Sequence, residues 1–169
     1  MTDTSTPPEG APQPNAAGQQ PGPALRVLKQ FVRDLSFENP GHRPLEEQPN
    51  IDLNIDVGAT QHTSGNNTYE VALRMNATAK AGETTLFVCE LDYAGVFQIQ
   101  NAQKEQLEPL LLIECPRLMF PFARRIIAEI TQEGGFPPLM IDPVDFIQIY
   151  QKQKAAAAQN AQTPPVGQA

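Results

Sequence analysis

The feature that most restricts the fold of this 169-residue chain is an apolar stretch, Leu110–Tyr150, that prolines interrupt repeatedly. A proline removes a backbone donor and clashes with the preceding helical turn, so helices end or kink where it occurs. The stretch therefore predicts short apolar helices joined by rigid apolar connectors, not one long helix or a membrane span. Such connectors either pack in a core or line an exposed groove. The interrupting residues are Pro116, Pro121, Pro137, Pro138 and Pro143.

The composition limits the class of protein. The length suits one domain with a hydrophobic core. A net charge of −7 argues against nucleic acid as a partner, because phosphate binding needs clusters of Lys and Arg. The longest uninterrupted apolar run, Leu110–Ile113, is far shorter than the roughly 18 residues that a spanning helix needs. The N-terminal sequence MTDTSTPPEG has no signal-peptide pattern. We therefore expect a soluble cytoplasmic protein that does not insert into membranes.

The chain divides into one domain and two tails. Polar, proline-containing sequence predicts flexible tails at residues 1–23 and 155–169, with a single domain at 24–154. Three segments alternate between apolar and polar residues and predict antiparallel strands at Asn50–Val57, Tyr69–Lys80 and Thr84–Ile99. Ala24–Phe37 fits helical and strand spacing alike, and its propensity alone favours a helix.

Helical patterns follow the strands. We expect helices at Asn101–Glu114, where Pro109 starts or divides the helix, and at Phe122–Glu133, which Pro121 opens and Gly134-Gly135 ends. A last helix is expected to begin at Asp142-Pro143 and to continue through Lys154. A sheet followed by helices packed on one face is an α+β fold.

The sequence contains no recognisable catalytic or metal-binding set. His42 and His62 both lie in polar loops without a nearby nucleophile, and Cys89 and Cys115 lack metal-ligand spacing. No glycine-rich phosphate-binding motif is present. We therefore expect neither an enzyme nor a cofactor, and we expect the two cysteines to be free thiols.

Four segments together carry a resemblance to a known family. They are RDLSFEN (Arg33–Asn39), TLFVCELDYAGVFQI (Thr85–Ile99), ECPRLMFPFARRII (Glu114–Ile127) and GGFPPLMIDPVDF (Gly134–Phe146). In this order they resemble the SecB export chaperones of Gram-negative bacteria, over roughly Leu25–Tyr150. The resemblance implies that Leu25–Phe37 is the first of four antiparallel strands. It also implies a long helix, shorter C-terminal helices, and a homotetramer that is a dimer of dimers.

The resemblance implies a function as well. Members of the family are ATP-independent chaperones that bind unfolded secretory precursor proteins and deliver them to the SecA motor. The alternative is an oligomerisation or binding module of the same fold without an export function. A narrower alternative within the family is service to a dedicated client system, such as a toxin–antitoxin pair.

Two sets of residues match functional positions of the family. Asp34, Glu38 and Glu90 match the acidic positions that dock the zinc-bearing C-terminal tail of SecA, and their alternative role is that of solvated strand acids. A second set matches positions whose substitution weakens tetramer assembly, and ordinary sheet packing is its alternative. This set is Cys89, Leu91 and Tyr93.

Unfolded clients are expected to bind in an apolar groove between the sheet and the helices, because apolar attraction is largely non-directional and accepts many sequences. We assign Leu110–Ile113 instead to packing between protomers. Glu47 lies where family members carry Trp in the loop after the first strand, so this end of the groove is expected to be less aromatic. The candidate groove residues are Phe87, Phe97, Leu118, Phe120, Phe122 and Phe136.

Overall fold

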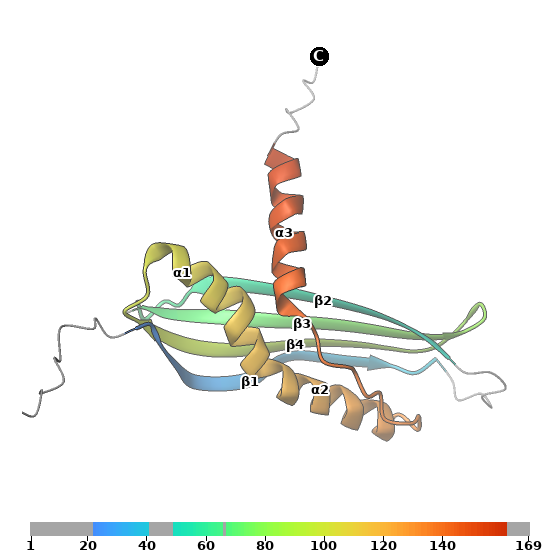
Figure 1. Ribbon diagram of the computed structural model, residues 1–169. Coiled ribbons are helices and arrows are strands. Elements are labelled where there is room, and N and C mark those ends of the chain that lie inside the picture. The colour runs from blue at the N-terminus through green and yellow to red at the C-terminus, as the bar shows by residue number, and fades with distance from the viewer. Residues whose placement is uncertain (1–21, 41–48, 66, 162–169) are drawn as a thin grey trace, which may run out of the picture.

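The computed structural model describes residues 22–40, 49–65 and 67–161 as one four-stranded sheet and a set of helices (Figure 1). The strands are antiparallel and lie in the order β1-β4-β3-β2. Residues 1–21 and 162–169 of the predicted tails, together with His42 and Glu47, lie outside the described residues, whereas residues 155–161 of the predicted C-terminal tail form the end of the last helix. The elements are β1 (Ala24–Glu38), β2 (Asn50–Gln61), β3 (Thr68–Ala81), β4 (Thr84–Gln100), α1 (Lys104–Pro109), the π-helical turn η1 (Leu110–Glu114), α2 (Cys115–Glu133) and α3 (Phe146–Ala161).

The first segment is a strand, as the family resemblance implies, and the local preference for a helix is wrong. β1 pairs with β4 from Ala24, opposite Gln100, to Glu38, opposite Val88. The register shifts twice along this pairing, at Leu28 and at Arg33. Hydrogen bonding to β4 and burial of apolar side chains against the core outweigh a weak helical propensity.

The helical run is longer than the prolines predict. α1, η1 and α2 follow one another without a break, and Pro109, Pro116 and Pro121 all lie inside this run. In η1 the Cys115 N–H bonds to the carbonyl oxygen of Leu110, five residues earlier, so the turn is wider than an α-helical turn. Pro116 then falls in the first turn of α2, where a missing N–H costs least. The expected helix start at Phe122 is therefore wrong, because η1 and burial on the sheet allow α2 to begin at Cys115.

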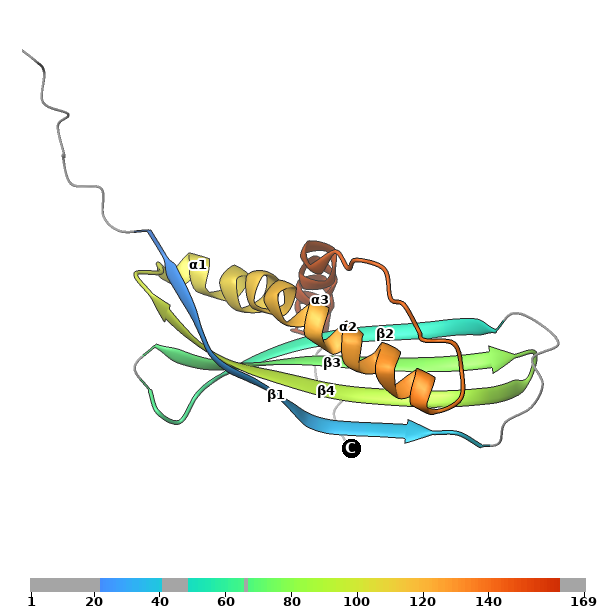
Figure 2. The ribbon, with the colours of Figure 1, turned by 90° about the horizontal axis from the view of Figure 1, so that it is seen from below.

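The core lies between α2 and one face of the sheet (Figure 2). Its most deeply buried large side chains include Leu73 and Met75 on β3, Leu91 on β4, and Met119 and Ile127 on α2. At one end the rings of three phenylalanines gather, with centroids 5.6 Å apart for Phe37 and Phe87 and 5.0 Å apart for Phe87 and Phe136. This packing attaches the edge strand β1 to the connector that follows α2.

That connector begins as expected but ends later. Gly134 caps α2 and the next glycine has a φ of 86°, so the predicted Gly-Gly helix end is confirmed. The last helix begins at Phe146, however, and Asp145 is its cap in place of Asp142. The Asp145 Oδ1 accepts hydrogen bonds from the N–H groups of Ile147 (2.9 Å) and Gln148 (3.3 Å).

α3 is attached to the body at its first turns and projects away from the sheet (Figure 1). Phe146 is buried and its ring packs edge-on against Phe120, with centroids 5.9 Å apart. From Lys154 to Gln159 the side chains of α3 are exposed. No helix in the described part of the chain combines the length and apolarity needed to cross a membrane.

The buried hydroxyl of Thr131 supplies a test of how the connector is held. It donates to the carbonyl oxygens of Ile127 (2.9 Å) and Ala128 (3.0 Å) and accepts from the N–H of Leu139 (2.9 Å). Thr131→Val keeps the shape but leaves the Leu139 N–H without this acceptor, so we expect the free energy of unfolding to fall by about 1–3 kcal/mol. Urea denaturation at matched protomer concentration measures this.

Thr131→Ser is the matched control, since it keeps the hydroxyl and loses only a methyl group, at a cost of roughly 1 kcal/mol. A free energy of unfolding that is the same in the valine variant and the wild type would contradict the proposed role of the hydroxyl.

Candidate functional site

The helices leave the second face of the sheet open, and the strand register fixes which side chains lie on it. A side chain faces the same side of the sheet as the residue paired with it on the neighbouring strand. Polar and charged residues therefore line up in rows across the four strands. From β1 to β2, one row is Asp34, Asp92, Arg74 and Asp56, the next is Ser36, Glu90, Asn76 and Asn54, and the third is Glu38, Val88, Thr78 and Asp52.

The three predicted docking acids share this open face. Asp34 and Glu38 face the same way on β1, and Glu90 lies on the neighbouring strand in the row between them. The bulge at Arg33 makes this possible. Val32 pairs with Tyr93, on the face that the helices cover, whereas Asp34 pairs with Asp92 on the open face. Without the extra residue the two acids of β1 would point toward the helices.

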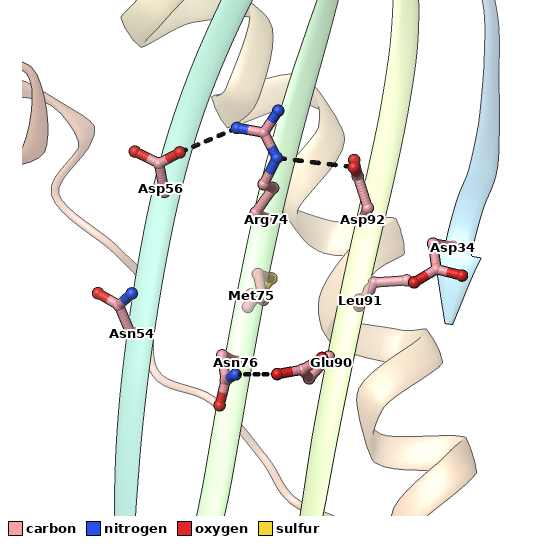
Figure 3. Close-up of a pocket in the computed structure, with 9 residues that line it drawn as sticks. All are labelled: Asp34, Asn54, Asp56, Arg74, Met75, Asn76, Glu90, Leu91 and Asp92. Atoms are coloured by element: carbon pink, nitrogen blue, oxygen red, sulfur yellow. Dashed lines mark hydrogen bonds and ion pairs between the residues drawn. The ribbon is translucent and has the colours of Figure 1, made fainter. Parts of the chain in front are cut away.

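Two arginines neutralise other carboxylates on the same face. Arg33 pairs with Glu70 (Nη1–Oε1, 2.9 Å) and with Asp92 (Nη2–Oδ2, 2.6 Å). Arg74 lies 3.0 Å from Asp56 Oδ2 and 3.6 Å from Asp92 Oδ2 (Figure 3). The hydrogen bond to Asp92 is the main reason why the pKa of Arg33 is raised. We call this chain of alternating charges, from Glu70 to Asp56, the charge ladder.

The docking acids are left outside the charge ladder. Within the described part of the chain, neither Asp34 nor Glu38 has an ion-pair partner, and Glu90 accepts a hydrogen bond from the uncharged Asn76 (Nδ2–Oε1, 2.6 Å). Asp34, Asn76 and Glu90 line a shallow pocket on this face, which also contains Asp56 and Arg74 (Figure 3). The arrangement therefore offers uncompensated negative charge along β1 and β4, which suits a basic partner.

The residues matched to tetramer assembly lie on the other face. Cys89, Leu91 and Tyr93 alternate along β4 and are all buried in the core of the protomer. Sheet packing, the alternative considered from the sequence, describes their positions. Within the protomer, each of the three is at most 6% exposed.

The candidate groove residues separate into two groups. Phe87, Phe97, Phe120 and Phe136 are buried in the core. Leu118 and Phe122 project from α2 and are 45% and 50% exposed. Of the six candidates, these two offer apolar surface to solvent.

The structure reveals a further groove, between β2 and α3, that the sequence reasoning missed. Leu53, Ile55 and Ile149 supply its apolar side chains, and Lys152 and Gln153 lie at its border. The alternating apolar residues of β2 were visible in the sequence. Their partial exposure was not, because it follows from the edge position of β2 and the outward direction of α3.

The described residues hold no group of three or more His, Cys, Asp or Glu side chains that could bind a metal ion. His62 lies in the loop between β2 and β3, where its Nδ1 is 2.9 Å from the hydroxyl of Ser64. The Ser64 N–H also lies 3.2 Å from this nitrogen, so the ring is held within the turn.

Comparisons with known proteins agree on one family. Residues 18–157 match the family model described as preprotein translocase subunit SecB. The protein-export protein SecB of Hyphomonas neptunium is 64% identical over 96% of this chain and 96% of its own length. That of Maricaulis maris is 52% identical over 96% of this chain and 94% of its own length.

A solved structure shares the fold at low sequence identity. It is a SecB-like chaperone of Mycobacterium tuberculosis in complex with a ChAD peptide from the HigA1 antitoxin. The two chains superpose with a TM-score of 0.63 and 11% identity, over 72% of this chain and 91% of the other. At this identity the likeness establishes the fold alone.

The two buried cysteines allow a test of the core beneath α2. Burial, and to a lesser degree a neighbouring glutamate, raises the pKa of Cys89 to about 11 and that of Cys115 to about 12. Because the thiolate is the reactive form, we expect neither thiol of the native protein to react with iodoacetamide at pH 8. Mass spectrometry would detect both adducts in urea-unfolded protein, which serves as the control. Labelling of native Cys89 at the unfolded rate would contradict this packing.

Proposed function

We propose that this chain, which belongs to the SecB family, is an ATP-independent chaperone that binds unfolded secretory precursor proteins in the cytoplasm and delivers them to the SecA motor. The observation that carries the proposal is the match to the family over residues 18–157, with 64% identity to one export protein over nearly the full length of both chains. The alternative, an oligomerisation module without an export function, is not favoured by this similarity.

Client binding is assigned to the exposed apolar surface beside the helices. Leu118 and Phe122 on α2, and Leu53, Ile55 and Ile149 in the groove between β2 and α3, offer apolar contact without directional demands. The four buried phenylalanines act indirectly, because they fix the positions of the sheet and the helices that carry this apolar surface. They are Phe87, Phe97, Phe120 and Phe136. A surface of this kind binds many unfolded sequences, because every unfolded chain exposes apolar side chains.

SecA docking is assigned to the open face of the sheet. Asp34, Glu38 and Glu90 lie together there and are not neutralised by the charge ladder. The basic, zinc-bearing tail of SecA has the complementary charge. Docking on this face leaves the apolar surface around α2 and α3 accessible, so one protomer can hold a client and meet SecA together.

Assembly as a dimer of dimers is supported by the outer edge of β1. This edge has no strand partner among the described residues, and it carries exposed apolar side chains. An exposed apolar edge strand favours pairing with another strand. The buried residues Cys89, Leu91 and Tyr93 would influence assembly from within the protomer core, because they set the position of α2. The exposed large apolar side chains of β1 are Val27, Leu28, Val32 and Leu35.

The purified protein is expected to suppress aggregation of a urea-unfolded secretory precursor on dilution, without ATP. Light scattering measures aggregation, and the folded precursor serves as the control that should not bind. Photo-cross-linkers at Phe122 and Ile149 should capture the unfolded client, whereas one at the exposed Lys80, near the β3–β4 turn, should not. Unchanged aggregation in the presence of excess protein would overturn the chaperone proposal.

Charge reversal tests the docking surface. Glu90→Lys places a cation among the docking acids, so we expect affinity for a zinc-loaded SecA tail peptide to fall at least about tenfold. Isothermal titration calorimetry measures the affinity, and binding to the wild type should weaken as salt is raised. The matched control is Glu105→Lys on α1, which makes the same change in net charge away from this face. An equal loss in both variants would indicate an effect of net charge alone.

A further inference from the structure

Gln153 joins α3 to the edge strand β2. Its Nε2 donates to Oδ1 of Asp56 (2.7 Å) and lies 3.2 Å from the carbonyl oxygen of Val57. Both acceptors belong to β2, on the border of the groove that Leu53, Ile55 and Ile149 line. The bond therefore spans the groove and connects its two walls.

The buried apolar contacts of α3 lie near its start. Phe146 is buried against Phe120, and Ile149 packs against the core, whereas the side chains from Lys154 to Gln159 are exposed. Gln153 lies two turns beyond Phe146, at the boundary between the anchored and the projecting part. The hydrogen bond at this position ties the last anchored turn of α3 to β2.

Asp56 is shared between this bond and the open face. Its second oxygen, Oδ2, accepts from Arg74 (3.0 Å), and Arg74 also faces Asp92 (3.6 Å) in the charge ladder (Figure 3). One carboxylate thus serves α3 on one side and the ladder on the other. A cation bound on the open face would compete with Arg74 and Gln153 for the carboxylate of Asp56.

We propose that Gln153 is a positioning residue that sets the width of the groove between β2 and α3, and that Asp56 couples this groove to the open acidic face. The inference rests on the proposed function of both surfaces. A basic partner docked at Asp34 and Glu90 enters the pocket that Asp56 also lines, so its cations compete with Arg74 for Asp56 and turn this carboxylate away from Gln153, which frees α3. Since coupling between two sites is reciprocal, a broken Gln153 bond also favours the partner.

The chemistry of the side chain supports a positioning role. The amide of glutamine provides a donor that fits a carboxylate and a strand carbonyl at once. Glutamate in its place has the same shape but would set a negative charge against Asp56. Gln153→Glu should therefore disturb the groove more than Gln153→Ala, which a role in filling space alone would not produce.

Hydrogen exchange of the full-length protein tests the positioning role. We expect amides of α3 after Ile149 to exchange about fivefold faster in Gln153→Ala than in the wild type, and faster still in Gln153→Glu. Exchange in β3 and β4 should not change. Gln151→Ala removes an exposed glutamine from the same helix, and its α3 amides should exchange at the wild-type rate. Unchanged α3 exchange in both Gln153 variants would overturn the role.

The coupling is tested with the zinc-loaded SecA tail peptide. It should accelerate α3 exchange in the wild type but not further in Gln153→Ala, and it should bind this variant about two- to fivefold more tightly. Equal affinities, with α3 exchange in the wild type unaffected by bound peptide, would overturn the coupling. If the wild type does not bind the peptide at all, the proposed docking function and the coupling fail together, whereas the positioning role is still decided by exchange without peptide.

Discussion

The packing of α2 on one face of the sheet decides what every other surface of this protein can do. Met119 and Ile127 are fully buried against residues such as Leu73 and Leu91. Since side chains alternate along a strand, covering one face commits half of each central strand to this core and directs the other half to the opposite face. Cys89 and Glu90 are neighbours in sequence, yet one is fully buried and the other faces the open acidic surface.

The bulge at Arg33 brings the edge strand into agreement with this division. The extra residue changes which side chains of β1 point to each face of the sheet, so that Val32 points to the covered face and Asp34 to the open face. It also allows Arg33 to reach Glu70 and Asp92, two acids on the central strands. A single extra residue thus turns Asp34 and Glu38 to the open face and places beside them the arginine that neutralises Glu70 and Asp92. Exposed ion pairs of this kind add little stability, so their effect lies mainly in where net charge remains.

Much of the fold follows from the sequence where the pattern is local. Alternation identifies β2, β3 and β4, and Gly134-Gly135 marks the end of α2. β1 is ambiguous because its partner, β4, lies about 60 residues away along the chain, and local propensity contains no information on that pairing. The prolines mislead for a related reason. Whether Pro116 breaks a helix depends on the π-helical turn before it and on the sheet that buries α2.

The candidate surfaces were predictable to a smaller degree. Strand parity places Asp34 and Glu38 together, but their proximity to Glu90 requires the register with β4 and the bulge. Composition marks the phenylalanines as apolar, although it does not separate the buried Phe97 from the exposed Phe122. The bond from Gln153 to Asp56 joins residues almost a hundred positions apart, so no sequence pattern predicts it.

The position of Asp56 gives this small sheet a property that neither face has alone. The groove beside α3 is apolar, and the open face is acidic, so each suits a different kind of partner. Such surfaces are usually independent, because exposed charges are screened over about 10 Å. Here direct contacts replace long-range attraction, since Gln153, Asp56, Arg74 and Asp92 touch in sequence from the helix to the centre of the sheet. The hydrogen bond from the uncharged Gln153 weakens less in salt than the exposed ion pairs of Arg74 and the attraction of a basic partner to the face.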